Sequence, residues 1–322
     1  MSRAVVIRQL GGPEVLRLEE RGDAAPGENE IAVENAAIGL NFIDIYRRTG
    51  LYPVSLPAVL GGEGVGAVTA IGAAVSGFAP GERVAYMSAG AYASRTLANA
   101  GMAVKVPAGL SSELAAAAFL KGLTAAMLVR DVFALGPGDK ALVYAAAGGV
   151  GSILTQWAAH LGAEVIAVVG ETAKAKLAKD YGAAHVIVRA KTDSIAADVR
   201  RLTHDRGVDV VYDSVGAATF EASLDSLALR GMMVSYGNAS GAVPPMAPLE
   251  LNRRGSLFLT RPSLAHYATP ERLPAMAALL FAMIEKGHVK IPAPTVFPLE
   301  KTADAHRLLE SGKSTGAIVL RP

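Results

Sequence analysis

The chain has 322 residues, of which 51% are hydrophobic and 19% charged, with a formal net charge of +2. This composition allows two domains with large cores, excludes general disorder, and gives no electrostatic case for nucleic acid as the main partner. The chain has no cysteine, which excludes disulfides, thiolate metal sites and cysteine nucleophiles and fits a cytoplasmic location.

The first part of the chain, residues 1–110, is predicted to be rich in β-strands. Short runs between glycine, proline and polar turns predict strands at Ala4–Ile7, Glu30–Glu34, Val65–Ile71, Arg83–Tyr86 and Ala103–Val106. One helix interrupts them at Asn41–Arg48, because Asn41 is a good capping residue and Gly50 follows the helix end.

A long helix is expected over residues 111–134. Its most apolar part, 114–129, is mostly alanine and contains Lys121 and Gly122, so we expect a buried helix rather than a membrane span. The first residues, MSRAVVIRQLGGPE, have charges too closely spaced for the core of a signal peptide. A soluble protein is therefore expected.

Strands and helices alternate from residue 140 onward. Strands are expected at Lys140–Ala145, Glu164–Val169, His185–Val188, Val208–Tyr212 and Met232–Tyr236, with helices at Val150–Leu161, Thr172–Tyr181, 193–204 and 219–229. This order predicts an α/β fold with a parallel sheet and right-handed crossovers. After about residue 262 the alternation ends, with helices near 270–286 and 301–310 and a last strand at Ala317–Leu320.

The turn between the first of these strands and its helix carries the strongest local motif. Ala145, Gly148 and Gly151 form the pattern A-x-x-G-x-x-G. Small residues let the backbone approach a pyrophosphate, and the helix N-terminus offers free N–H groups and a partial positive charge. We therefore predict a dinucleotide site at Ala147, Gly148, Gly149 and Val150; the alternative is a glycine-rich turn that binds no nucleotide.

The choice of dinucleotide depends on the end of the next strand. NAD sites usually place an acid there against the ribose 2′-hydroxyl, whereas this strand ends at Gly170. Gly170 leaves space, and Lys174 and Arg189 could neutralise a 2′-phosphate, which favours NADPH. The opposing interpretation is that Glu171 binds a ribose hydroxyl and the two cations are solvated.

Further motifs, taken together, identify a family. The chain resembles the zeta-crystallin-like quinone oxidoreductases, the zinc-free branch of the medium-chain dehydrogenase/reductase superfamily, over nearly its whole length. The matching segments are Gly11–Leu16, Gly39–Tyr46, Gly50–Pro53, Phe119–Thr124, Ala145–Gly151, Val211–Gly216, Tyr236–Gly241, Gly255–Phe258 and Thr260–Ser263.

The resemblance implies a GroES-like catalytic domain at residues 1–123, completed by 265–322, with a Rossmann doubly wound parallel sheet inserted at 124–264. It also implies NADPH, reduction of quinones, and a homodimer in which Rossmann sheets join edge to edge through Ser256–Thr260. Zinc alcohol dehydrogenases of the superfamily have a cysteine and a Gly-His-Glu motif where this chain has Gly39-Leu40-Asn41 and Gly61-Gly62-Glu63. The six histidines are scattered, so we expect no metal site.

Three residues near the first helix are the candidate catalytic residues. In the resembling family, residues matching Asn41, Tyr46 and Tyr52 line the nicotinamide and substrate cleft. We expect Tyr46 and Tyr52 to hydrogen-bond the acceptor carbonyl and Asn41 to orient the nicotinamide or the substrate. The alternative is that Asn41 and Asp44 only cap the helix and the tyrosines only pack.

Further cofactor residues follow from the resemblance. Thr124 approaches the cofactor, and Ser214, Tyr236, Asn238 and Ser240 lie at the carboxyl end of the sheet near the nicotinamide. Two positions depart from the family: Tyr236 replaces a phenylalanine, and Arg189 replaces a tyrosine that faces the adenine–phosphate end. Lys121 must reach water or meet a partner.

Other functions stay open on the sequence. An NADPH-dependent reductase of enones or alkenals would use the same cofactor site. An NADPH-binding sensor or an RNA-binding protein without turnover is an alternative of another class, although no basic cluster supports RNA.

Overall fold

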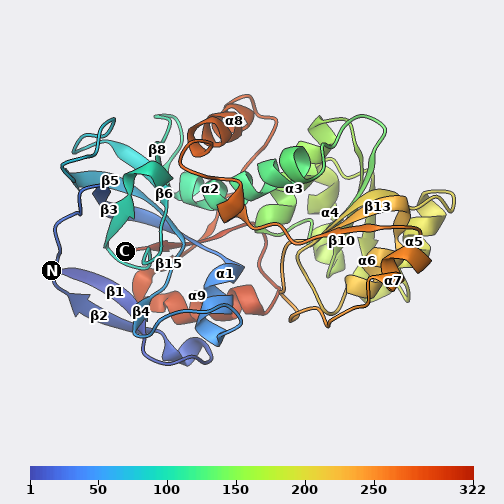
Figure 1. Cartoon of the computed structure of the whole chain (residues 1–322), viewed down its shortest axis with the longest axis horizontal. Helices are drawn as coiled ribbons and strands as arrows, with labels where there is room; N and C mark the ends of the chain where they lie inside the picture. Colours follow the sequence, from blue (N-terminus) through green and yellow to red (C-terminus); the bar gives the residue numbers. More distant parts are fainter. The chain divides into compact units, whose positions relative to one another are not determined.

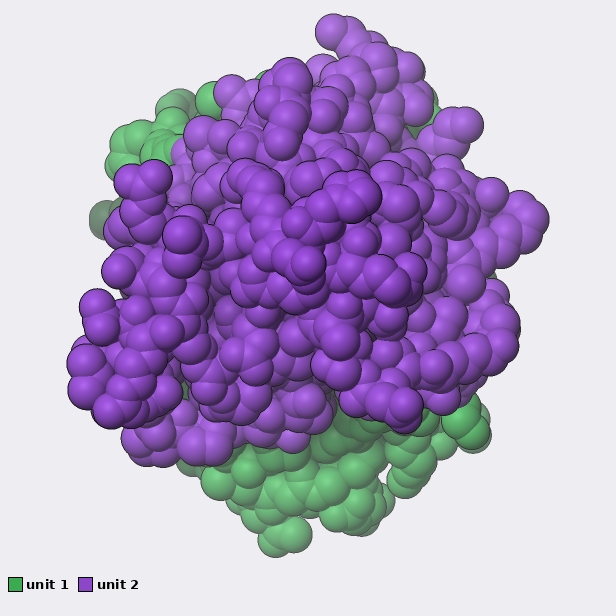
Figure 2. Space-filling model, turned by 90° about the vertical axis from the view of Figure 1, so that its right-hand side faces the viewer, with its two compact units in different colours: residues 1–121, 268–281, 291–322 green, residues 122–267, 282–290 purple.

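The computed structural model describes residues 1–322 and divides into two compact units (Figure 2). Unit 1 comprises Met1–Lys121, Ala268–Phe281 and Ile291–Pro322, and unit 2 comprises Gly122–Tyr267 and Ala282–Lys290. Both ends of the chain thus build unit 1, and the middle builds unit 2. The domain boundaries expected from the sequence remain a prediction, and residues 282–290 are the segment where the compact units depart most from them.

Unit 1 contains two β-sheets (Figure 1). The larger has the order β15-β16-β3-β5-β6-β8, with β7 also pairing with β3; the smaller has the order β2-β1-β4. The strands are β1 Ser2–Ile7, β2 Arg17–Arg21, β3 Glu30–Leu40, β4 Ala58–Val59, β5 Glu63–Ile71, β6 Arg83–Met87, β7 Arg95–Asn99, β8 Ala103–Lys105, β15 Thr295–Pro298 and β16 Ile318–Arg321. Because β16 pairs antiparallel with β3, the C-terminal end of the chain completes a sheet begun near its N-terminus.

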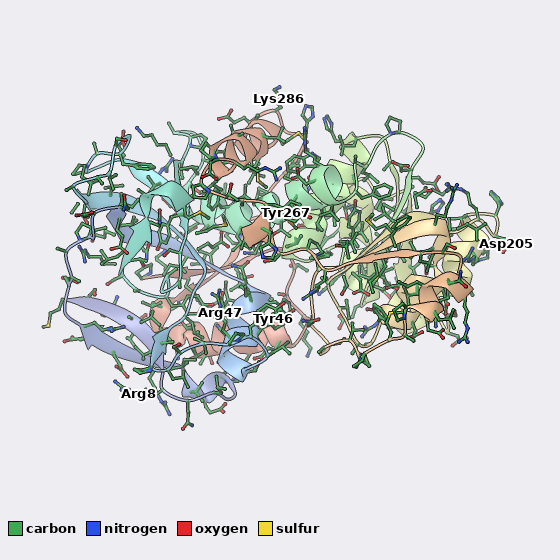
Figure 3. All side chains as sticks on the ribbon, viewed as in Figure 1. Arg8, Tyr46, Arg47, Asp205, Tyr267 and Lys286 are labelled. Atoms are coloured by element: carbon green, nitrogen blue, oxygen red, sulfur yellow. The ribbon has the colours of Figure 1, made fainter.

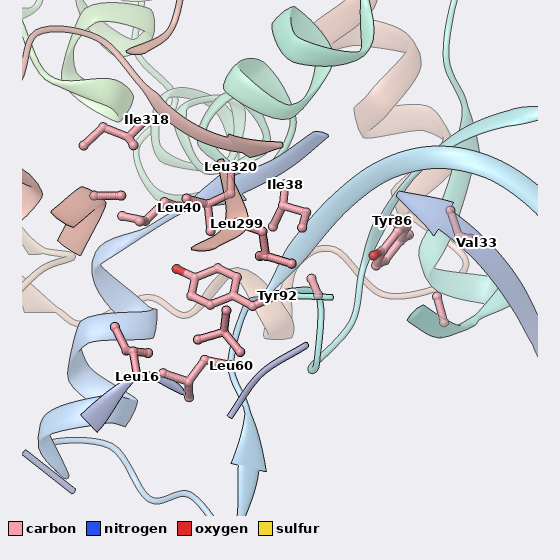
Figure 4. Close-up of a cluster of buried hydrophobic side chains, with 14 of the residues drawn as sticks. Leu16, Val33, Ile38, Leu40, Leu60, Tyr86, Tyr92, Leu299, Ile318 and Leu320 are labelled. Atoms are coloured by element: carbon pink, nitrogen blue, oxygen red, sulfur yellow. The ribbon is translucent and has the colours of Figure 1, made fainter. Parts of the chain in front are cut away.

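The core of unit 1 lies between its sheets and helices. Its helices are α1 Phe42–Thr49 and α9 Thr302–Glu310, with the first part of α2 Ser112–Met127 and most of α8 Leu273–Glu285. Figure 4 shows Tyr92 among Leu40, Leu60, Leu299 and Leu320, all buried. Burial of such side chains supplies about 25 cal/mol per Å² of apolar surface, so this cluster, which includes Ala305 of α9, fixes α9 against the strands.

Unit 2 is an open parallel sheet with the order β11-β10-β9-β12-β13-β14. Its strands are β9 Lys140–Tyr144, β10 Glu164–Val169, β11 His185–Val188, β12 Val208–Asp213, β13 Leu227–Ser235 and β14 Phe258–Thr260, and its helices are α3 Gly149–His160, α4 Ala175–Asp180, α5 Ile195–Leu202, α6 Phe220–Asp225 and α7 Leu249–Arg253. The strand order reverses direction between β9 and β12, where ligands of doubly wound sheets bind. The predicted α/β fold is confirmed.

Several element predictions were wrong in their limits, among them the strand expected at Glu30–Glu34, which continues to Leu40 as β3. The helix expected at 219–229 ends at Asp225, and Leu227 already pairs with Val208 as the start of β13. The apolar run therefore continues a buried strand, because pairing beside β12 outweighs local helix propensity. The long helix expected to reach residue 134 ends at Met127 and continues as one π-helical turn over Leu128–Val132.

The segment Ser112–Val132 is long and apolar enough, by length and composition, to cross a membrane. However, 72% of its most apolar window is buried inside the protein, as in the core helix of a globular fold.

Gln156 explains why residues 282–290 belong with unit 2. Its side chain accepts from the Lys290 N–H at 2.8 Å and donates to the Lys290 carbonyl at 3.0 Å. This two-way pairing satisfies both main-chain groups of Lys290 and attaches the segment to α3.

Candidate active site

Two predicted catalytic tyrosines lie together in unit 1. The rings of Tyr46 and Tyr52 are 5.3 Å apart, and the Tyr52 N–H donates to the Tyr46 carbonyl at 3.0 Å. Gly50, with φ 85°, ends α1 and turns the chain back so that Tyr52 returns to the helix. The Tyr-Pro segment after the helix is therefore folded onto α1.

Asn41 is held by a buried ionic cluster at the start of α1. Its Nδ2 donates to Glu63 Oε1 at 2.9 Å, and Lys121 Nζ lies 3.3 Å from the same oxygen. The Leu120 N–H donates to the other Glu63 oxygen at 2.8 Å. Lys121 has thus met a partner instead of reaching water, and the Asn41 amide is held in place by Glu63.

Asp44 is fully buried and ends a chain of polar side chains. Its Oδ2 accepts from the Asn41 N–H at 3.0 Å and from the Tyr92 hydroxyl at 3.0 Å. Tyr92 also meets His306 Nε2 at 3.1 Å, and His306 Nδ1 meets Arg48 Nη1 at 3.1 Å. Because a guanidinium can only donate, His306 Nδ1 must accept, and the ring proton is therefore on Nε2. His306 Nε2 then donates to the Tyr92 hydroxyl, which in turn donates to Asp44.

Burial shifts the pKa values of Asp44 and His306 in this hydrogen-bonded series of side chains. Desolvation raises the pKa of Asp44 to about 6, against hydrogen bonds from Asn41 and Tyr92 that lower it. Desolvation, together with the charge of neighbouring Arg48, lowers the pKa of His306 to about 3. His306 is therefore neutral at physiological pH, and both of its ring nitrogens have partners.

The glycine-rich turn in unit 2 has the geometry of a dinucleotide site. Gly148 is the N-cap of α3 and provides no side chain, so the first-turn N–H groups of Gly149, Val150 and Gly151 have no acceptor within the helix. A Cβ on Gly151 would lie 2.2 Å from the Ala145 carbonyl oxygen, so only glycine allows this approach of helix and strand. Ala147 is buried, and Gly148–Val150 are half-buried.

The cationic candidates follow the next two strands. Gly170, after β10, is exposed, and a Cβ built on it would have nothing within 4 Å. Lys174 is half-buried in the following turn, and desolvation lowers its pKa. Arg189, after β11, is exposed, and the Ala190 N–H beside it donates to the Gly170 carbonyl at 3.3 Å. The ends of β10 and β11 are thus adjacent.

Loops after β12 and β13 carry the remaining candidates. The Ser240 hydroxyl donates to the Val215 carbonyl at 2.8 Å and accepts from the Ala218 N–H at 3.0 Å, which joins the two loops. A Cβ on Gly237 would lie 2.3 Å from the Ser214 carbonyl oxygen. Ser214, Tyr236 and Asn238 are half-buried at this edge, and Thr124 is half-buried on α2.

Sequence reasoning missed the residues that hold these loops. Buried Asp213 accepts from the Val215 and Gly216 N–H groups and from the hydroxyls of Thr219 and Ser223. In the sequence, Asp213 could have been noticed as an acidic residue at the end of an apolar strand. Arg261 donates to the Ser235 carbonyl at 2.7 Å and the Gly237 carbonyl at 3.1 Å. The Glu63, Tyr92 and His306 contacts join distant segments and had no local signal.

No group of three or more histidine, aspartate or glutamate side chains in the structure could hold a metal ion. The fold and the two sets of residues instead define a class. A doubly wound sheet with a glycine-rich turn, inserted into a β-rich unit made from both chain ends, is the architecture of the medium-chain dehydrogenase/reductases.

Comparison with known proteins agrees with this class. Residues 27–119 match the alcohol dehydrogenase GroES-like domain family, and residues 149–281 match the zinc-binding dehydrogenase family. The chain is 45% identical to a quinone oxidoreductase of Pseudomonas aeruginosa, with 100% of both chains covered. A 2-haloacrylate reductase of Burkholderia sp is 40% identical, with 100% of this chain and 99% of the relative covered.

A solved structure is similarly close. The Escherichia coli quinone oxidoreductase complexed with NADPH superposes with a TM-score of 0.97 at 45% identity, over 100% of both chains. The chain belongs to the quinone oxidoreductase family of the medium-chain dehydrogenase/reductases.

Proposed function

We propose that the protein reduces quinones with NADPH and without zinc. The observation that carries the proposal is the uncapped N-terminus of α3 behind a turn that only glycine permits, at the sheet edge where dinucleotides bind. The full-length similarity to quinone oxidoreductases, one of them in complex with NADPH, supports both the acceptor and the cofactor.

The residues present fit this cofactor. The first-turn N–H groups at Gly149 and Val150 would bind the pyrophosphate, beside Ala147 and Gly148. Gly170 leaves room for a 2′-phosphate, which Lys174 and Arg189 would neutralise. Residues proposed to lie along the rest of the cofactor are Thr124, Ser214, Tyr236, Asn238 and Ser240. When bound, NADPH supplies the hydride, and the protein orients it and excludes water.

The acceptor end of the proposed site is formed by Tyr46, Tyr52 and Asn41. The contact of the two tyrosine rings supports a shared role, in which their hydroxyls donate to the acceptor carbonyl while Asn41 orients the nicotinamide or the acceptor. We expect the double variant Tyr46→Phe, Tyr52→Phe to lower kcat/KM for a quinone by about a hundredfold while NADPH binding is unchanged. Unchanged turnover would remove the tyrosines from the mechanism.

Zinc-independence rests on the ligands that the chain carries. A catalytic zinc needs three protein ligands, and Asn41 and Gly62 stand where the zinc branch has cysteine and histidine. An electron-poor quinone needs less polarisation than a simple alcohol, so hydrogen bonds can suffice.

The test is NADPH and NADH oxidation by the purified protein with 1,4-benzoquinone, a naphthoquinone and an enone, each with and without chelator. We expect chelator-insensitive turnover of a quinone, faster with NADPH. NADPH binding without turnover on any acceptor would contradict the proposed activity, and failure to bind either nucleotide would contradict the cofactor site.

A second candidate activity is reduction of an activated carbon–carbon double bond. The similarity to 2-haloacrylate reductase favours it, since both activities deliver a hydride to an electron-poor acceptor from the same cofactor site. The enone arm of the assay separates the two, because a double-bond reductase would have its larger kcat/KM there.

We propose that the protein is a cytoplasmic homodimer. Strand β14 lies at the edge of the unit 2 sheet, and it exposes Phe258 by 57% and Leu259 by 39%, with Leu229 of neighbouring β13 exposed by 80%. An apolar, unpaired edge supports pairing with a second copy.

A further inference from the structure

Gly62 borders a small space in unit 1 that two polar groups share. A Cβ built on Gly62 would lie 3.8 Å from Asp44 Oδ1, 4.0 Å from Arg47 Nη1 and 4.0 Å from Leu120 Cδ1. These are ordinary van der Waals distances, so the space beside the Gly62 α-carbon can hold an additional atom. Gly62, Arg47 and Leu120, which surround this position, are each only half-buried.

Asp44 contributes an oxygen that no protein group satisfies. Oδ2 accepts two hydrogen bonds, whereas Oδ1 is fully buried and has no hydrogen-bond partner. A buried carboxylate oxygen without a donor costs free energy, so such an atom calls for a ligand or a role. It faces the Gly62 space.

Arg47 contributes a cation with no ion-pair partner. It lies next to Tyr46 on α1, as Figure 3 labels, three residues after Asp44. Its neighbour Arg48 pairs with Glu310, but the Arg47 guanidinium forms no hydrogen bond or ion pair. A half-buried guanidinium with unused donors is a binding group for an oxygen that carries or develops negative charge.

We propose, building on the quinone reductase function above, that Arg47 and Asp44 form a subsite for the reducible oxygen of the acceptor beside Gly62. The Arg47 guanidinium donates to the quinone oxygen, and Asp44 Oδ1 carries the proton that this oxygen receives. The ligand class is therefore a quinone, bound through a carbonyl oxygen that becomes a hydroxyl.

The electrons and protons of this reaction are accounted for by NADPH, the quinone and the Asp44 carboxyl. When bound, NADPH would supply a hydride, that is two electrons and one proton, and would be left as NADP⁺; the quinone would then be a hydroquinone monoanion. Arg47 stabilises the anionic oxygen. The proton of the Asp44 carboxyl then forms the O–H bond, and the carboxylate takes up a proton again after the product has left.

The surroundings of Asp44 suit this exchange. The Asp44 pKa of about 6 lies below the pKa of a phenol, so proton transfer from Asp44 to the oxyanion is favourable. The same pKa is close enough to neutrality for the carboxylate to take up a proton again. Arg47 on its own helix and the Tyr92 hydroxyl favour the carboxylate, while the charge of Glu63 on β5 disfavours it. His306 on α9 and Arg48 act through Tyr92.

The experiment compares Arg47→Gln, Arg47→Lys and Gly62→Ala in the full chain. Gly62→Ala fills the space without a steric conflict, so its fold is preserved. Arg17→Gln removes an exposed arginine elsewhere, and Gly109→Ala adds a methyl group to open space, which makes them matched controls. Steady-state kinetics with 1,4-benzoquinone, NADPH binding and thermal unfolding are measured for each protein.

We expect Arg47→Gln and Gly62→Ala to lower kcat/KM for the quinone by about tenfold to a hundredfold, with NADPH affinity, Tm and both controls unchanged. Arg47→Lys should recover part of the loss. Asp44→Asn keeps an acceptor for Asn41 and Tyr92, and we expect it to abolish any rise in kcat as the pH falls from 8 toward 6.

Other results would overturn the subsite. Wild-type turnover with unchanged Arg47→Gln and Gly62→Ala kinetics would refute it and leave the proposed function standing. A loss confined to NADPH affinity would assign Arg47 to the cofactor instead. No quinone turnover by the wild-type protein would refute the function and the subsite together.

Discussion

Two buried ionisable residues, His306 and Asp44, contribute in opposite directions to the pH dependence of this protein's stability. His306 has its pKa lowered to about 3 from 6.5, so only the unfolded chain takes up its proton as the pH falls through 6.5. Asp44 has its pKa raised to about 6 from 3.8, so the folded chain takes up that proton first. The two residues therefore have opposite effects on stability in mildly acidic solution.

A pair of variants separates these effects. Between pH 7 and pH 5, His306 should cost about 2 kcal/mol of stability, and Asp44 should add about 1 kcal/mol. We expect His306→Gln to become more stable as the pH falls through this range and Asp44→Asn to lose stability more steeply than the wild type. Urea unfolding at both pH values measures the slopes, and parallel slopes for the two variants would contradict the assignment.

At the scale of elements, the approach of α3 to β9 is the contact that the dinucleotide site depends on. In Gly151→Ala the new methyl group would meet the Ala145 carbonyl oxygen at 2.2 Å, so the turn must move. We expect NADPH affinity to fall by about tenfold or more and Tm to fall by several degrees. Gly22→Ala, with open space around it, is the control.

Trp157, the only tryptophan, offers a direct reporter of this change. It is buried on α3 itself, so its fluorescence follows the packing of the helix that the variant displaces. A Gly151→Ala protein with wild-type fluorescence, NADPH affinity and Tm would show that the turn tolerates a side chain.

At the scale of the whole molecule, the exposed edge of unit 2 predicts assembly. Leu229→Glu together with Phe258→Glu places charge on two exposed apolar positions, one on β13 and one on the edge strand β14. We expect the wild type to sediment as a dimer and the double variant as a monomer that still binds NADPH. A monomeric wild type in analytical ultracentrifugation would contradict the proposed homodimer.

Local patterns in the sequence determined much of this protein. Apolar strands alternating with helices specified the parallel sheet, since hydrophobic periodicity is a local property. The A-x-x-G-x-x-G turn and Asn41 before α1 were readable because turns and caps depend on a few consecutive residues. The lack of cysteine, with Asn41 and Gly62 in place of zinc ligands, predicted the zinc-free branch.

Tertiary structure alone decided which distant residues meet. Residues 227–229 became strand because β12 lies beside them, and Lys121 found Glu63 because α2 packs near β5. The chain from Arg48 through His306 and Tyr92 to Asp44 joins three separate segments. Desolvation and long-range hydrogen bonds shift a pKa only after the chain has folded, so no local pattern could predict Asp44 and Arg47 beside Gly62.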